Sequence, residues 1–113
     1  MQITREHGFK RMDKINMMTS NKDIKKLTEA ITIIGAITYL DTDKETGEAK
    51  PVGAIKTKDG EIYGFTSGTL IECTDMIIDQ FEDGVKSFTL IPVTGTSNAG
   101  RTFYQFKIID IEE

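Results

Sequence analysis

The stretch TLIECTDMIIDQFEDG (residues 69–84) decides the fold, because its apolar residues recur with the period of an α-helix in a chain that otherwise reads as β-strands. One stripe of this helix is apolar and the opposite face is acidic. Thr69 and Glu72 predict a capping box at its start, and Gly84 predicts its end. The apolar stripe consists of Leu70, Ile77, Ile78 and Phe81, with Cys73 or Thr74 between them.

Three strands are predicted before this helix. ITIIGAITYL (31–40) is rich in β-branched residues and predicts a long strand, in which Gly35 indicates a bulge or a sharp coil where the strand turns a corner. PVGAIKTKDGEIYGFTS (51–67) predicts two further strands. The dipeptide Asp59-Gly60 between them is typical of a type I′ hairpin turn.

Two strands are predicted after the helix, at 86–94 and 101–112, joined by the loop GTSNAG (95–100). The order is therefore three strands, a helix and two strands. This order, with a glycine inside the first strand, resembles the OB-fold, a five-stranded Greek-key barrel. The sequence thus predicts a mainly β protein, a five-stranded OB-fold-like β-barrel with one amphipathic α-helix between strands 3 and 4. SH3-like barrels and other small α+β folds use similar parts.

The N-terminal residues differ in character from the rest. Residues 1–19 are basic and rich in methionine without clear periodicity, which predicts a partly ordered arm that settles against a partner or a second subunit. In SNKDIKKLTEA (20–30), Ser20 and Asp23 resemble the cap of a short helix. The predicted domains are a basic arm with a short helix (1–30) and an OB-like barrel (31–113).

Composition limits the class of protein. A chain of 113 residues with 38% hydrophobic residues fits one packed domain. The formal charge of −4 is unevenly spread: residues 1–26 carry seven Lys or Arg against three Asp or Glu, and residues 27–83 carry four against twelve. No acidic residue lies between Asp83 and Asp110. The absence of a signal peptide or membrane span, together with a single cysteine, predicts a cytoplasmic protein.

No catalytic, metal or cofactor site is predicted. His7 is the only histidine and lies in the predicted arm, where we expect it to be solvated, and Cys73 falls near the apolar stripe of the helix. The acidic loop beginning at Asp41 has Thr46 and Val52 where a calcium-binding EF-hand needs Gly and Glu. We therefore expect no enzyme activity.

The last strand, RTFYQFKIIDI, carries the pattern that predicts function. Alternation places Tyr104, Phe106 and Ile108 on the core face. The other face then presents a cation, an aromatic ring, an amide and a second cation. Aromatic rings stack on the bases of single-stranded nucleic acid, and Lys and Arg follow its phosphates. The alternative is that Phe103 covers a second small core under the N-terminal helix.

This pattern predicts a single-stranded DNA-binding protein without sequence preference. Phe103 is the main stacking residue, and Tyr63 and Tyr39 are weaker candidates. Lys56 and Lys58 share a face of their strand by alternation and would extend the cationic track. The predicted nucleic-acid-binding residues are Phe103, Arg101, Lys107, Gln105, Lys56, Lys58, Tyr63 and Tyr39.

The order of elements, the helix TLIECTDMIIDQFEDG and the closing SNAGRTFYQFKI together resemble the small single-stranded DNA-binding proteins of bacteriophages of low-GC bacteria. This resemblance implies protection of single strands during phage replication or recombination, in the host cytoplasm, by a homodimer or higher oligomer. Many proteins of this kind end in a long acidic tail that recruits partners, whereas this chain ends in DIEE. Recruitment through a tail is therefore not expected.

A second function, from a different class, is a protein-interaction module, such as a phage structural subunit or a small inhibitor of a host protein. Its contact surface would be the acidic face contributed by residues 41–83, and its aromatic residues would all be structural. Solvent exposure of Phe103 discriminates between the two functions.

Overall fold

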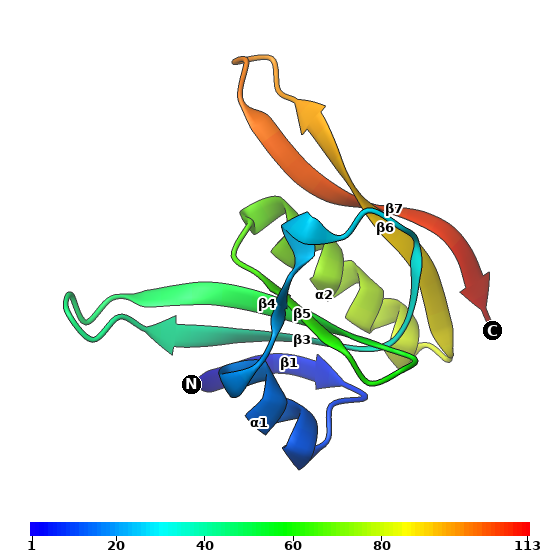
Figure 1. Cartoon of the computed structure of the whole chain (residues 1–113), viewed down its shortest axis with the longest axis horizontal. Helices are drawn as coiled ribbons and strands as arrows, with labels where there is room; N and C mark the ends of the chain where they lie inside the picture. The colour runs from blue at the N-terminus through cyan, green and yellow to red at the C-terminus, as the bar shows by residue number, and fades with distance from the viewer.

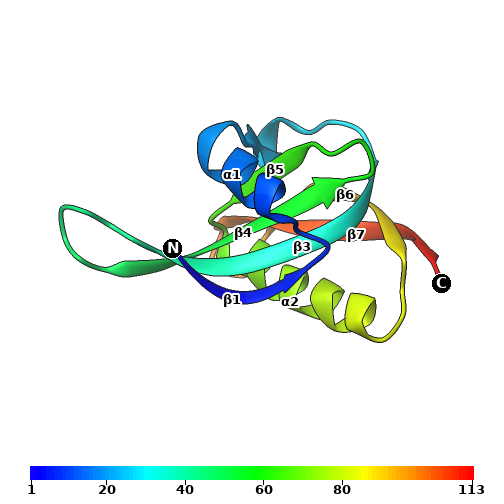
Figure 2. The same cartoon turned by 90° about the horizontal axis from the view of Figure 1, so that it is seen from below.

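One seven-stranded sheet curls into half a barrel and carries a helix on each side, as the computed structural model of all 113 residues shows (Figure 1). Figure 2 shows α1 on one side of the sheet and α2 on the other. The protein is therefore mainly β, with seven strands and two α-helices where five strands and one main helix are predicted. The elements are β1 Gln2–His7, α1 Arg11–Thr19, β2 Lys22–Asp23, the 3-10 turn η1 Ile24–Lys26, β3 Ile31–Thr42, β4 Ala49–Thr57, β5 Ile62–Phe65, α2 Gly68–Glu82, β6 Ser87–Thr96 and β7 Thr102–Glu112.

The long strand β3 organises the sheet, whose order is β2-β5-β4-β3-β6-β7, with β1 also paired to β3. One edge of β3 pairs with β4. The other edge pairs with β6 through Ile31–Ile33 and with β1 from Ala36 onward. The register of the β3–β4 pair shifts between Ile33 and Gly35, which confirms the predicted bulge. Because a Cβ on Gly35 would lie 2.9 Å from the His7 carbonyl oxygen, only glycine lets the end of β1 approach so closely.

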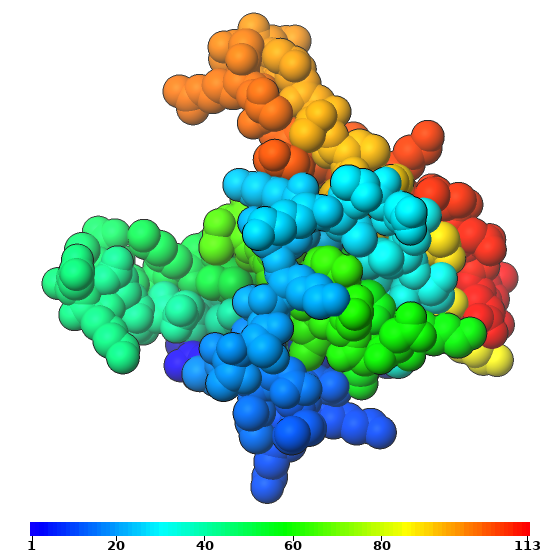
Figure 3. Space-filling view, in the orientation of Figure 1, coloured from blue at the N-terminus to red at the C-terminus, as the bar shows by residue number.

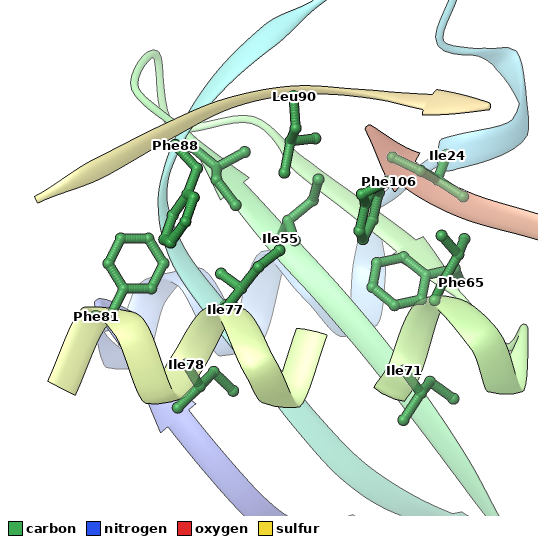
Figure 4. Packing of buried hydrophobic residues seen from close by; sticks show 13 residues of the cluster. Ile24, Ile55, Phe65, Ile71, Ile77, Ile78, Phe81, Phe88, Leu90 and Phe106 are labelled. Atoms are coloured by element: carbon green, nitrogen blue, oxygen red, sulfur yellow. The ribbon is translucent and has the colours of Figure 1, made fainter. Parts of the chain in front are cut away.

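Helix α2 covers the concave face of the sheet and builds the main core (Figure 4). Its predicted stripe is confirmed, with Thr74 rather than Cys73 fully buried between the apolar residues. The predicted capping box at Thr69 is wrong, because α2 begins two residues earlier, with Ser67 as its N-cap. The Ser67 Oγ accepts a hydrogen bond from the Leu70 backbone N–H at 3.5 Å. Gly84, at φ +112°, ends the helix as predicted.

The N-terminal residues are an integral part of the sheet rather than a partly ordered arm. β1 pairs antiparallel with β3. Met17 of α1 and Phe9, which precedes α1, pack into a second core with Ile37 and Ile62 on the convex face of the sheet. The helix predicted at 20–30 is also wrong. The two-residue strand β2 and the 3-10 turn η1 form there instead, and the Asp23 carboxylate caps η1 by accepting a hydrogen bond from the Lys25 backbone N–H.

The half-barrel is closed by η1 rather than by strand pairing. β5 pairs with β4 on one edge and with the two residues of β2 on the other, so it makes no ladder with β7. Ile24 of η1 is fully buried in the main core, and Figure 4 shows it beside Phe65 and Phe106. The rings of Phe65 and Phe106 pack edge to face, with centroids 5.5 Å apart.

The β4–β5 turn differs from the predicted type I′ turn. Among its residues only Gly60 has a positive φ, +88°, whereas a type I′ turn needs two such residues. The Gly60 N–H donates to the Thr57 carbonyl, and the Thr57 N–H donates to the Glu61 carbonyl. This is the three-residue hairpin loop in which one glycine takes the left-handed position.

A shielded ion pair fixes α1 on the sheet. The Lys56 Nζ lies 2.7 Å from the Asp13 carboxylate, which also accepts from the Lys10 backbone N–H at 2.8 Å. Burial by itself raises the pKa of Asp13, but the hydrogen bonds from Lys56 and Lys10 and their charges outweigh it and lower the pKa below its ordinary value of 3.8. Folding is therefore favoured while this carboxyl is ionised.

We expect this pair to make stability depend on pH. As pH falls below about 5, the unfolded carboxyl takes up its proton first, so the Asp13 contribution is lost progressively until pH passes below the folded pKa. Asp13→Asn should lower the melting temperature at about pH 7 and narrow the difference between the melting temperatures at about pH 7 and about pH 3. An unchanged difference between the two pH values would contradict this role.

Neither α1 nor α2 has the length and hydrophobicity that a membrane-spanning helix needs.

Candidate nucleic-acid interface

The β6–β7 hairpin projects from the body of the molecule as a two-stranded ribbon (Figures 1 and 3). β6 pairs with β3 only through Phe88–Leu90, whereas its pairing with β7 continues to Thr96. Beyond Leu90, each strand of the hairpin therefore has only the other as a partner. Gly100, at φ +78°, closes the loop, where its N–H donates to the Ser97 carbonyl.

The two faces of β7 are divided as alternation predicts. Phe106 is buried in the main core, and Tyr104 and Ile108 pack against that core. On the opposite face Gln105 and Lys107 are exposed and Phe103 is half-buried. Arg101 is exposed at the base of the loop, immediately before β7. We call these four residues, Arg101, Phe103, Gln105 and Lys107, the outer row.

Phe103 lies outside both cores of the protein. It pairs across the hairpin with Gly95, and a Cβ built on Gly95 would lie 2.5 Å from the Phe103 Cζ. The ring therefore rests against the bare backbone of β6, which fixes its position. The second core under α1, which was the alternative place for this ring, is filled by other residues. Phe103 is thus held on the outer face of the hairpin instead of being sealed inside the fold.

The charges around the outer row favour the binding of an anion. The hairpin carries no acidic residue from Ser87 to Ile109. Neither Arg101 nor Lys107 has a carboxylate within 4.0 Å, and all six salt bridges of the protein use other cations. Both cations are therefore free to bind phosphate groups.

Lys25 is a candidate contact that the sequence did not single out. Its Nζ lies 5.3 Å from the centroid of the Tyr104 ring, on the core side of the hairpin. Lys25 is exposed and makes no salt bridge. The dipeptide Lys25-Lys26 is visible in the sequence, but its proximity to β7 follows only from the way η1 closes the barrel. The hairpin thus has a cation beside an aromatic ring on each face.

Two predicted contacts are excluded by their surroundings. Lys56 is bound to Asp13 beneath α1, and its Nζ also lies 3.4 Å from the Gly8 carbonyl oxygen. Tyr39 is buried in the core under α1, and this burial raises the pKa of its hydroxyl. Neither side chain is available to a nucleic acid in this fold.

Tyr63 and Lys58 remain accessible but do not lie on the β6–β7 hairpin. Tyr63 is half-buried on β5, and its hydroxyl donates to Glu61 at 3.4 Å. Its ring lines a surface hollow of about 540 Å³ together with Lys22 and Lys26. Lys58 is exposed in the β4–β5 turn and makes no salt bridge. The structure therefore does not join these two residues to the outer row.

His7 and Cys73, the two side chains considered for catalysis, both pack against apolar residues. His7 ends β1, and its ring stacks on Phe81 with centroids 4.7 Å apart, so it is not the solvated arm residue that was predicted. Cys73 lies at the edge of the main core. Burial raises the pKa of its thiol, an effect that a hydrogen bond from the Phe106 backbone only partly offsets. The reactive thiolate is therefore disfavoured.

The acidic face of α2 is partly neutralised within the chain. The Arg5 guanidinium lies 2.6 Å from the Asp79 carboxylate and 3.2 Å from that of Glu82, and it donates to the Asp75 carbonyl at 3.1 Å. The cations of the outer row are thus unpaired, whereas Asp79 and Glu82 of α2 share Arg5 as a partner. Comparison of the chain with protein-family models, curated proteins and solved structures finds no match.

Proposed function

We propose that the protein binds single-stranded DNA, without strong sequence preference, through the outer row of the β6–β7 hairpin. The observation that carries this proposal is the position of Phe103, which lies outside both cores on the part of the hairpin, Ser87 to Ile109, that has no carboxylate. One side of the half-buried Phe103 ring rests on Gly95, and the cations of the outer row form no salt bridge. This arrangement matches the combination of stacking and phosphate contacts that single strands require.

The outer row assigns a role to each residue. A base stacks on the exposed side of the Phe103 ring, which the contact with Gly95 holds in place before binding. Arg101 and Lys107 neutralise phosphates on either side of the stacked base, and the Gln105 amide donates or accepts a hydrogen bond. Lys107 follows Phe103 by four positions along the strand, a span of about 13 Å. Stacking and phosphate contacts are common to all bases, which accounts for binding without sequence preference.

The arrangement of the sheet supports the proposal. Strands β3, β4, β5, β6 and β7, with α2 after the third, follow the order of a small OB-like barrel, and we propose that the half-barrel is an opened form of that fold. The β6–β7 loop then corresponds to the loop between the fourth and fifth strands, which OB-folds commonly use to hold oligonucleotides. In this proposal η1 replaces the missing closure between β5 and β7.

The biological role that we propose follows from this binding mode. A protein that holds single strands by stacking and charge, independently of sequence, can coat and protect them during DNA replication or recombination. We propose that this role is carried out in the cytoplasm of an infected host, as the resemblance to phage proteins implies. Binding to duplex DNA should be much weaker, because paired bases offer no free face to Phe103.

A fluorescence-anisotropy titration tests the function. We expect a labelled oligo(dT) to bind, and a duplex of equal length to bind far more weakly. If Arg101, Lys107 and Lys25 contact three phosphates, affinity should fall about 20-fold between about 50 and about 200 mM salt. Equal affinity for single strands and duplex, or no affinity for either, would contradict the proposal and favour a protein-interaction module.

A further inference from the structure

Helix α1 exposes a row of large apolar side chains on its outer face. Met12 is 64% exposed, Ile15 50% and Met18 67%. Their spacing of three residues places them along one side of the helix, opposite the buried Asp13 and Met17. We call Met12, Ile15 and Met18 the α1 stripe. No other segment of the chain covers these side chains.

We propose that the α1 stripe is the interface of a homodimer, in which two copies of α1 pack antiparallel about a two-fold axis at Ile15. The stripe is symmetric in sequence, because Met12 and Met18 lie three residues on either side of Ile15. A two-fold axis at Ile15 therefore places Met12 of each copy against Met18 of the partner subunit. Such self-complementarity is what a two-fold interface requires.

A hollow beside Met18 provides the complementary shape. It has a volume of about 250 Å³, and its lining combines apolar side chains with Asn21 and Asp41. In the antiparallel arrangement this hollow receives Met12 of the partner subunit, whose flexible thioether adapts to an irregular cavity of mixed polarity. By symmetry the same contact forms twice. The hollow is lined by Met1, Met17, Met18, Asn21, Tyr39 and Asp41.

The charges of α1 fit the same arrangement. Arg11 is exposed in the first turn and makes no salt bridge, and the last turn of α1 contains no basic residue. Antiparallel packing brings Arg11 of the partner subunit beside the last turn, near Thr19. The carbonyl groups at a helix C-terminus carry partial negative charge, so this contact is favourable. The acidic residue of α1, Asp13, faces the sheet and is already bound to Lys56.

The expected dimer is weak and leaves the hairpin free. Three side chains per copy bury less than the roughly 800 Å² per partner of a standard interface, so dimerisation should depend on protein concentration. The Asp13–Lys56 pair already fixes α1 on the sheet in the monomer, so dimerisation costs little conformational entropy for ordering this helix. Figure 1 shows α1 and the hairpin loop at opposite ends of the molecule. The dimer is therefore independent of the proposed DNA contacts.

Sedimentation velocity over a concentration series tests the interface. The wild type should shift from monomer to dimer, and Ile15→Glu should raise the dissociation constant at least about a hundredfold, because it buries two unpaired like charges at the axis. Ile109→Glu is the matched control: Ile109 is 54% exposed, lies on β7 and should leave the dimer unchanged. A monomeric wild type, or a dimer insensitive to Ile15→Glu, would overturn the proposal.

Disulfide trapping provides a second variant that does not introduce a charge. A residue on a two-fold axis lies next to its own copy, so Ile15→Cys should form an intermolecular disulfide under oxidised glutathione. Ile109→Cys and the wild type, which both retain Cys73, should remain uncrosslinked. Circular dichroism checks that each variant is folded. Equal crosslinking of the Ile15→Cys and Ile109→Cys variants would show random collision and would overturn the proposed axis.

Discussion

Phe103→Leu is expected to weaken binding of oligo(dT) about tenfold, within the range of about 1 to 3 kcal/mol for loss of one base–aromatic stack. Leucine keeps an apolar side chain against Gly95, so the hairpin retains its cover, but leucine has no flat π face for a base. Adding Arg101→Ala should weaken binding further and reduce its salt dependence, because one phosphate contact is lost. Fluorescence anisotropy measures both effects.

The matched control for this experiment is Tyr63→Leu. It removes another half-buried aromatic ring, but from β5 rather than from the β6–β7 hairpin. Binding should stay within about twofold of the wild type, because no stacking contact is assigned to Tyr63. Melting temperatures of all variants separate loss of binding from loss of folding. If Phe103→Leu binds like the wild type, the ring is structural and the outer row is not the interface.

Ile24→Ala is expected to lower the free energy of unfolding by about 2 to 5 kcal/mol, an effect usual for a fully buried aliphatic side chain. Ile24 is 0% exposed and lies in the main core where η1 closes the half-barrel. The truncation leaves a cavity beside Phe65 and Phe106, which have no strand pairing across this gap to compensate. Urea denaturation, monitored by circular dichroism, gives the change.

The control for the closure experiment is Ile109→Ala, which removes the same atoms from an exposed position on β7. Its effect should remain below about 0.5 kcal/mol. If Ile24→Ala costs no more than this control, η1 does not close the barrel. If Ile24→Ala disturbed only the neighbouring Lys25–Tyr104 contact, the loss of unfolding free energy would also be much smaller than the value predicted for the cavity.

Periodic patterns in the sequence predicted the parts of the fold that bury a regular face. The 3.6-residue period predicted α2, and Gly35 predicted the bulge of β3. Alternation predicted which side of β7 faces the core, so the outer row was assigned correctly to the outer face. Local hydrogen bonds were harder to predict. Ser67 and Thr69 are equally plausible caps of α2, and the β4–β5 turn needs only one residue with positive φ, Gly60, instead of the two of a type I′ turn.

Features set by long-range contacts were not predictable from these patterns. α1 buries only Asp13 and Met17 among its nine residues, so it has no buried apolar stripe from which the helix could be predicted. Alternation correctly placed Lys56 on the opposite face from the main core, but its partner Asp13 lies 43 residues away. The resulting pair removed Lys56 from the predicted interface. Lys25 was missed for the same reason, since its contact is with a ring on β7.

The most direct test of the central claim is an amide ¹H–¹⁵N NMR titration of the 12.6 kDa protein with unlabelled oligo(dT). Binding through the hairpin predicts the largest shift changes from Arg101 to Lys107, with smaller changes at Lys25 and none along the acidic face of α2. Shift changes confined to α2, or spread evenly over the protein without a maximum in β7, would contradict the account.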